Sequence, residues 1–238
     1  SKEKTMPNWV KTSFIVTGTP EALAAFKEGV RLVHPEAPDD ESKARDFSFK
    51  RILPMPEELN IESSSDGDMG VAALTGEGLA SWLSCGWVQE ANVTTREGFE
   101  KLLQEKRPNA LALGRKYLDN LAKYGVTTWY AWCNLNWQTK WDACESCVET
   151  QADGSLKYFF ETAWSFPEPV FSKLAEMFPD VTIKGSVDEE GGFFYGEFTV
   201  ENGQLCVDFQ EGTRKGGPYD YGDEDEDEDN TEDAAPAN

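Results

Sequence analysis

The chain has 238 residues, enough to bury a core as one large domain or as two small ones. Its formal net charge is −22, from 44 acidic and 22 basic residues. Proteins that bind nucleic acid directly neutralise phosphates with Lys and Arg, so this charge argues against such binding and against an anionic membrane surface. A basic protein partner would complement the charge, although the charge can also act on solubility alone.

The N-terminal segment is expected to begin with a strand at residues 9–17, in which alternating apolar side chains share one face. Thr19-Pro20-Glu21 then predicts a helix, with Thr as the N-cap and Pro at the first helical position. After a polar loop at 35–43, a short strand is expected at 47–53. Residues 63–68 are small and polar, and we expect them to be mobile.

The middle of the chain is predicted to be helical. Thr94-Thr95-Arg96-Glu97 has the capping-box pattern and precedes apolar residues at helical spacing. A second apolar stripe runs from Leu111 to Leu121 and ends at Gly125. Basic residues in these helices alternate with acids, which is typical of a solvated helix surface.

The second half is predicted to consist mostly of strands, with one helix at 167–178 and a tight turn at Asn202-Gly203. The strands are expected at 127–133, 156–164, 181–187, 193–200 and 205–209. Strands interrupted by a few helices predict an α+β fold with helices packed on antiparallel sheet. Beyond Gly212 the apolar residues become rare, and a run of acids too highly charged to pack predicts disorder. This run is Asp223, Glu224, Asp225, Glu226, Asp227, Glu228 and Asp229.

Enzymatic and metal-dependent functions find little support. His34 is the single histidine, and a metal site with two histidine ligands is therefore excluded. His34 is expected at the end of a helix. Cys144 and Cys147 form a C-x-x-C pair, but the other three cysteines lack the spacing of a zinc site. No glycine-rich phosphate loop is present. We therefore expect no catalytic residue, no metal ligand and no cofactor.

The cellular compartment follows from the cysteines and the N-terminus. Five cysteines without the spacing of secreted proteins indicate reduced thiols, and no segment resembles a signal peptide or an apolar membrane span. A cytoplasmic protein is expected.

A tryptophan-rich stretch is the most unusual feature of the sequence. It places Asn136, Lys140 and Asp142 among four indoles, a composition that suits a shaped, partly buried binding surface. The alternative is a packed turn at a sheet edge, in which Lys140 pairs with Asp142 or a tail acid and lies across an indole face. The four indoles belong to Trp129, Trp132, Trp137 and Trp141.

Three motifs, NWQTKWDA from Asn136, LPMPEEL at 53–59 and TAWSFPEPV at 162–170, resemble those of the YubB-type ferredoxin-like family of phage and plasmid proteins. The resemblance runs from Met6 to about Phe209, and that family has no settled activity. It implies that both halves of the chain are ferredoxin-like. The family usually has Gly at the position of Gln138 and Pro at the position of Phe166, and both positions are in turn-like places.

The expected organisation is an N-terminal ferredoxin-like unit with a helical insertion (1–125), a C-terminal ferredoxin-like unit (126–211) and a disordered acidic tail (212–238). The expected function is that of a non-enzymatic interaction protein of a phage or plasmid, whose acids mimic nucleic acid and inhibit or modulate a host nucleic-acid-binding defence protein. The alternatives are an enzyme or small-molecule-binding module that uses the cleft between the units, or a tail that binds a basic or metal-rich partner. The candidate partner-binding residues are Asn136, Trp137, Lys140, Trp141, Asp142, Asp188, Glu189, Glu190 and the acids 223–229.

Overall fold

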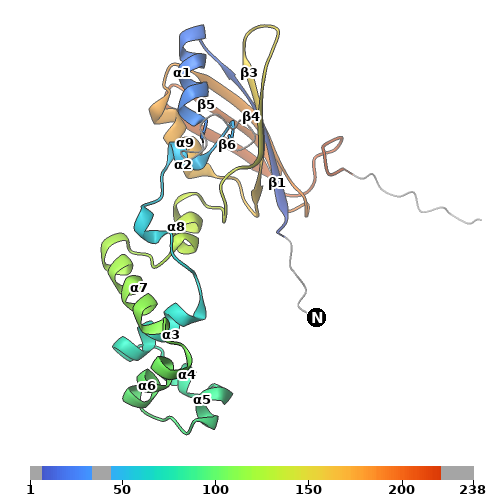
Figure 1. The fold of residues 1–238 in the computed structure, drawn as a ribbon. Coiled ribbons are helices and arrows are strands. Elements are labelled where there is room, and N and C mark those ends of the chain that lie inside the picture. The colour runs from blue at the N-terminus through green and yellow to red at the C-terminus, as the bar shows by residue number, and fades with distance from the viewer. Residues whose placement is uncertain (1–6, 34–43, 221–238) are drawn as a thin grey trace, which may run out of the picture.

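The computed structural model describes residues 7–33 and 44–220. These residues form two lobes, one built on a β-sheet and one made of helices, which lies below the sheet in Figure 1. The predicted α+β class, with helices on antiparallel sheet, is confirmed. In this part of the chain, none of the helices is long and apolar enough to cross a membrane.

The described residues contribute six strands to one antiparallel sheet, and the strand at 9–17 lies in its interior between strands of the second half. Two separate ferredoxin-like sheets were expected; the strands instead join in the order β2-β3-β1-β4-β5-β6. The physical reason is that the described residues between β1 and β2 form helices and no further strand of the sheet, so β1 finds its hydrogen-bonding partners only later in the chain. The strands are β1 (Trp9–Thr17), β2 (Cys144–Thr150), β3 (Leu156–Ala163), β4 (Thr182–Glu189), β5 (Tyr195–Glu201) and β6 (Gln204–Gln210).

One face of the sheet is covered by α1 (Pro20–Val30), α2 (Phe49–Ile52) and α9 (Glu168–Met177), as Figure 1 shows. Alternate residues of β1 are buried against these helices, as the period-two pattern predicted. Aromatic rings fill the core, with Phe14 stacked on Tyr158 at a centroid distance of 5.1 Å. The start of α1 is also confirmed, because the Thr19 hydroxyl accepts a hydrogen bond from the Ala22 amide.

The opposite face of the sheet is partly covered by residues 212–220. The Arg214 guanidinium donates to the Asp188 carboxylate at 2.8 Å and to the Gly196 carbonyl at 2.7 Å. Tyr219 is buried, and the Lys11 ammonium lies 4.4 Å from its ring centroid. The segment expected to be disordered from residue 212 is therefore held on the sheet as far as Tyr219. The acidic run at 223–229 lies outside the described residues.

Two segments predicted as strands are helical. Residues 47–53 contain the single turn of α2, and residues 127–133 lead into α8 (Trp129–Asn136). Aromatic residues favour strands on average, but Trp132 and Cys133 point into the core from one side of α8, and this packing decides the conformation. Residues 63–68, which were expected to be mobile, begin helix α3 (Ser65–Thr75).

The helical lobe has a hydrophobic core of its own, which includes Met69, Val88, Phe99 and Leu103. The predicted capping box is present in a shifted form, since Thr95 is the residue that caps α6 by accepting from the Gly98 amide. The lobe consists of α3, α4 (Leu79–Leu83), α5 (Gly86–Glu90), α6 (Arg96–Lys106) and α7 (Ala110–Tyr124).

Helices α3 and α7 cross at a contact between two glycines. A Cβ atom on Gly70 would lie 2.0 Å from the Ala110 carbonyl oxygen, and one on Gly114 would lie 2.4 Å from the Gly70 carbonyl carbon. Only glycine permits the two backbones to approach so closely. At its other end α7 stops at Gly125, which has a φ of 73° and confirms the predicted end of the helix.

The two connections between the lobes lie against each other. The Asn120 side-chain amide on α7 donates to the Glu58 carbonyl and to the Thr127 carbonyl, both at 3.0 Å. Glu58 belongs to the short 3-10 helix η2 (Glu57–Leu59) in the connection that leaves the sheet lobe, and Thr127 belongs to the connection that returns to it. This arrangement brings η2 and α8 together at the junction of the lobes.

Candidate functional site

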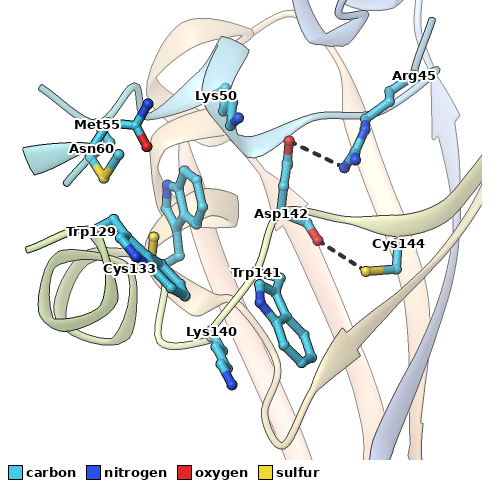
Figure 2. Close-up of a pocket in the computed structure, with 11 residues that line it drawn as sticks. Arg45, Lys50, Met55, Asn60, Trp129, Cys133, Lys140, Trp141, Asp142 and Cys144 are labelled. Carbon is cyan, nitrogen blue, oxygen red and sulfur yellow. Dashed lines mark hydrogen bonds and ion pairs between the residues drawn. The ribbon is translucent and has the colours of Figure 1, made fainter. Parts of the chain in front are cut away.

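A cavity of about 310 Å³ lies at this junction, between α8, α2, the segment at 55–60 and the loop that follows α8 (Figure 2). Its apolar walls are the indoles of Trp129, Trp137 and Trp141. Trp137, Lys140, Trp141 and Asp142, all predicted from the sequence as binding candidates, line it together.

Trp137 forms a fixed wall of the pocket. It is only 2% exposed, and its indole nitrogen donates to the Leu53 carbonyl at 2.9 Å. Its ring contacts Trp132 and Phe49 edge to face, with centroid distances of 5.5 Å and 5.6 Å. The indole is therefore held by contacts on several sides and cannot turn without breaking them.

The loop after α8 turns sharply at Gln138, whose φ is 60°. This left-handed conformation is easiest for glycine, which gives a physical reason for the glycine that the family resemblance implied at this position. The next residue fixes the loop on the sheet, because the Thr139 hydroxyl donates to the Ala163 carbonyl at 2.9 Å. The turn brings Lys140 and Trp141 to the mouth of the pocket.

Asp142 joins the loop to the start of α2. Its carboxylate is 8% exposed and accepts hydrogen bonds from the Ser48 hydroxyl at 2.7 Å, the Phe49 amide at 2.6 Å and the Ala143 amide at 2.9 Å. The Arg45 guanidinium lies 3.6 Å from it. These partners occupy the carboxylate, so its role here is to position the loop and the α2 terminus.

Lys140 lies across an indole, as one of the two interpretations of the sequence predicted. Its ammonium is 4.4 Å from the centroid of the Trp141 ring and 5.8 Å from that of Tyr130. The proposed pairing of Lys140 with Asp142 is wrong, since the cation beside Asp142 is Arg45. Trp141 is in turn stacked on Trp9, with a centroid distance of 6.2 Å.

The charges that line the pocket are mainly positive. Arg45, Lys50 and Lys140 face one carboxylate, that of Asp142, whose lone pairs are already engaged. Within the described residues, no carboxylate lies within ion-pair distance of Lys50 or Lys140. Figure 2 shows Lys50 above the cavity and Lys140 below it, with the Lys140 ammonium directed away from Lys50.

Two thiols line the pocket, and both are poor nucleophiles. Burial raises the pKa of Cys133 to about 11, although the nearby Lys50 opposes the shift. Burial also raises the pKa of Cys144, against the influence of Arg45. Both groups therefore remain protonated at neutral pH.

The C-x-x-C pair lies on β2, where a strand or turn was expected. The register shifts between Cys144 and Cys147, and Glu145 in the bulge has a φ of 49°. Cys144 lines the pocket while Cys147 is exposed. Among the residues that the structure describes, no group of three or more His, Cys, Asp or Glu side chains is arranged to hold a metal ion. His34 lies outside them.

The acidic candidates Asp188, Glu189 and Glu190 do not line the pocket and are engaged in the fold. Asp188 is 8% exposed and pairs with Arg214, while Glu189 is 3% exposed and accepts from the Phe193 amide at 2.9 Å. Glu190 accepts from the Trp9 amide at 2.9 Å. These carboxylates, expected to form part of a partner-binding surface, hold the ends of strands together.

Several pocket residues were not found from the sequence. Arg45, Lys50 and Asn60 come from a part of the chain distant from the tryptophan-rich stretch, and no local pattern connects them with it. Asn136, which was a candidate, instead caps the end of α8 by donating to the Trp132 carbonyl at 3.0 Å. The sequence signal that could have indicated these residues was the presence of two basic side chains, Arg45 and Lys50, close together in an acidic chain.

The fold and pocket define an α+β protein with a ligand-sized cavity beside its sheet. Residues 136–235 match the family model described as the ferredoxin-like domain in Api92-like protein. The crystal structure of protein Api92 from Yersinia pseudotuberculosis is similar with a TM-score of 0.43 and 13% sequence identity, over 90% of this chain and 100% of that chain. No curated protein matches the chain.

Proposed function

We propose that this chain is a binding protein and that its pocket takes a small anionic ligand. The main support is that three cationic residues, Arg45, Lys50 and Lys140, line a cavity whose one carboxylate is already hydrogen-bonded. This local excess of positive charge stands in a chain with a net charge of −22. An anion in the cavity would supply Lys50 and Lys140 with the partner that the described residues do not provide.

The groups around the cavity suit binding better than catalysis. The Cys133 and Cys144 thiols are kept protonated by burial, and the Asp142 carboxylate is held by three donors. A general base or nucleophile needs a free lone pair near the substrate, and these groups do not offer one. The sequence left open a small-molecule-binding module that uses a cleft between two ferredoxin-like units; the proposed site lies instead at the junction of the sheet lobe and the helical lobe.

Thermal denaturation in the presence of inorganic phosphate tests the proposal. A ligand that binds only the folded state raises the melting temperature in proportion to RT ln(1 + [L]/Kd). We expect phosphate to raise it relative to chloride at equal ionic strength, and we expect the double variant Lys50→Gln with Lys140→Gln to lose this increase.

The matched control is Lys27→Gln with Lys116→Gln, which removes two exposed lysines of α1 and α7. This control should respond to phosphate as the wild type does. An equal response in all three proteins would contradict the proposal, because the effect would then come from the surface charge in general.

A second proposed function follows from the charge. The chain would be a YubB-type interaction protein of a phage or plasmid, with a host nucleic-acid-binding protein as its basic partner. Residues 219–238 contain ten acids and no bases, so the remaining residues still have a net charge of −12. Acidic surfaces attract basic ones over about 8 Å at physiological ionic strength.

Salt dependence tests this second proposal. Affinity for a basic partner should fall steeply as salt rises, and duplex DNA should compete for the partner. A variant that lacks residues 221–238 shows whether the partner binds to the acidic run or to the rest of the chain. Binding that does not change with salt would contradict the proposal for both surfaces.

A further inference from the structure

We infer that the ligand of the pocket carries a flat aromatic ring in addition to its anionic group. Nucleoside monophosphates and aromatic carboxylates share this chemistry. The inference rests on the proposed function of the pocket as an anion site, and it adds a second requirement from a separate observation, the indoles that line the cavity.

Three of the eight tryptophans of the chain line this one cavity. Trp129 lies on the α8 side and Trp141 on the opposite side in Figure 2, and the buried Trp137 is also part of the lining. Trp141 is 36% exposed and Trp129 is half-buried, so neither indole is fully packed against the rest of the protein. Flat rings stack on indole faces, and the bases of nucleotides all have a π face.

The position of Lys140 provides a means of uncovering the Trp141 ring. The partners of its ammonium group in the structure are the π faces of Trp141 and Tyr130. A phosphate or carboxylate is a stronger partner for an ammonium than a π face is, because it bears a full charge and accepts hydrogen bonds. The anion of the ligand would draw Lys140 from the indole, while Trp9 keeps Trp141 in place from its own stacked position.

The size and the polar groups of the cavity limit the ligand further. Its volume of about 310 Å³ is at the lower end of the usual range for small-molecule sites, about 300 to 1,000 Å³. It therefore suits one ring system with one anionic group and is too small for a dinucleotide or a longer strand. The Asn60 amide at the wall can both donate to and accept from the edge of a ring.

Quenching of tryptophan fluorescence, with calorimetry as a second measurement, tests the inference on the full chain. The probes are inorganic phosphate, adenosine, the four nucleoside 5′-monophosphates and 4-hydroxybenzoate. We expect a ring-bearing anion to bind at least about tenfold more tightly than phosphate or adenosine, which is the effect of about 1.4 kcal/mol. Comparison of the nucleoside monophosphates with 4-hydroxybenzoate shows which of the two ligand classes, nucleotides or aromatic carboxylates, binds more tightly.

Two variants separate the ring from the anion. Trp129→Leu should weaken the binding of a ring-bearing anion by at least about fivefold, which is the lower end of the effect expected when an aromatic stacking partner is lost. It should leave the binding of phosphate unchanged. Lys50→Gln should weaken both by about tenfold, as expected for a hydrogen bond to a charged group. Trp164→Leu removes an exposed tryptophan outside the pocket and is the control. Circular dichroism should show that each variant is folded.

The possible outcomes distinguish this inference from the proposed function. If phosphate binds as tightly as the ring-bearing anions, the ring requirement is overturned while the anion site stands. If adenosine binds as tightly as its monophosphate, the anion site is overturned. If none of the probes binds, both are overturned. If Trp129→Leu affects phosphate and the ring-bearing anion equally, the effect is structural and contradicts stacking.

Discussion

Asp142 is the residue on which the geometry of the pocket most depends. Its carboxylate receives three hydrogen bonds that connect the loop after α8 with the first turn of α2. Two cations of the pocket, Arg45 and Lys50, lie on the segment that contains this turn, and Lys140 lies on the loop. One buried carboxylate therefore fixes the relative positions of all three.

Asp142→Ala should destabilise the fold by about 3 kcal/mol, because it leaves buried donors without partners at about 1 to 3 kcal/mol each. Urea unfolding measures this loss. Asp119→Ala, which removes an exposed carboxylate of α7, is the control and should change stability by less than about 0.5 kcal/mol. A similar result for the two variants would show that the Asp142 hydrogen bonds contribute little.

Gln138 is held in a left-handed conformation that costs a residue with a side chain about 1 to 2 kcal/mol. Gln138→Gly should remove this strain and stabilise the fold by up to about 1 kcal/mol, which corresponds to about 2 to 4 °C in melting temperature. Gln138→Ala keeps the Cβ atom and should give no such gain. Calorimetry of the three proteins checks the prediction, and equal stabilities would contradict it.

The buried thiol of Cys133 predicts a decrease in stability at alkaline pH. Its pKa is raised from 9.0 to about 11, so between these values the thiol ionises in the unfolded chain and stays neutral in the folded one. Its contribution to stability is complete below pH 9 and is lost as the pH rises towards 11. The full loss over these two pH units is about 2.7 kcal/mol, at about 1.36 kcal/mol per unit.

Urea unfolding at several pH values between 8 and 11 measures this effect. The stability of Cys133→Ala should fall less steeply over this range than that of the wild type, whatever the difference at pH 8. Parallel curves for the two proteins would show that Cys133 does not cause the decrease.

At the scale of elements, the glycine contact between α3 and α7 determines whether the helical lobe can form. Gly70→Ala places a methyl group where the Ala110 carbonyl lies, so we expect a destabilisation of about 3 kcal/mol, at the upper end for an overpacked core. Gly86→Ala is a matched control, because a Cβ atom there meets no heavy atom within 4 Å.

Hydrogen exchange can locate the damage that Gly70→Ala causes. Because the helical lobe has its own hydrophobic core, the amides of α3 and α7 should lose protection while those of β1, β3 and β4 retain it. Equal loss in both lobes would show that they unfold as one unit.

For the whole molecule, the C-terminal segment gives a prediction that two truncations can test. Removing residues 219–238 deletes the buried Tyr219 ring and its contact with Lys11, whereas removing 221–238 keeps both. The longer deletion should therefore be less stable than the shorter one by about 1 to 2 kcal/mol. Urea unfolding of the two chains measures the difference, and a value near zero would show that Tyr219 does not stabilise the sheet.

The sequence alone predicted the elements whose signals are local. The alternation in β1, the Thr19 cap, the end of α7 at Gly125 and the Asn202-Gly203 turn all depend on neighbouring residues, and the structure confirms them. It also predicted part of the site, because a dense group of tryptophans has to be packed or to line a binding surface. Here Trp137 is packed and Trp141 is partly exposed at the pocket.

Only the tertiary structure determined how these elements combine. Residues 127–133 have the composition of a strand, but burial of Trp132 and Cys133 on one side favours a helix. The interior position of β1 depends on pairing with residues 140 or more positions away in the chain, which no local pattern contains. In the same way, Arg45 and Lys50 reach the tryptophans because the Asp142 carboxylate holds the two segments together. The positive charge of the pocket is thus a property of long-range contacts, whereas the negative charge of the chain can be read directly from its residues.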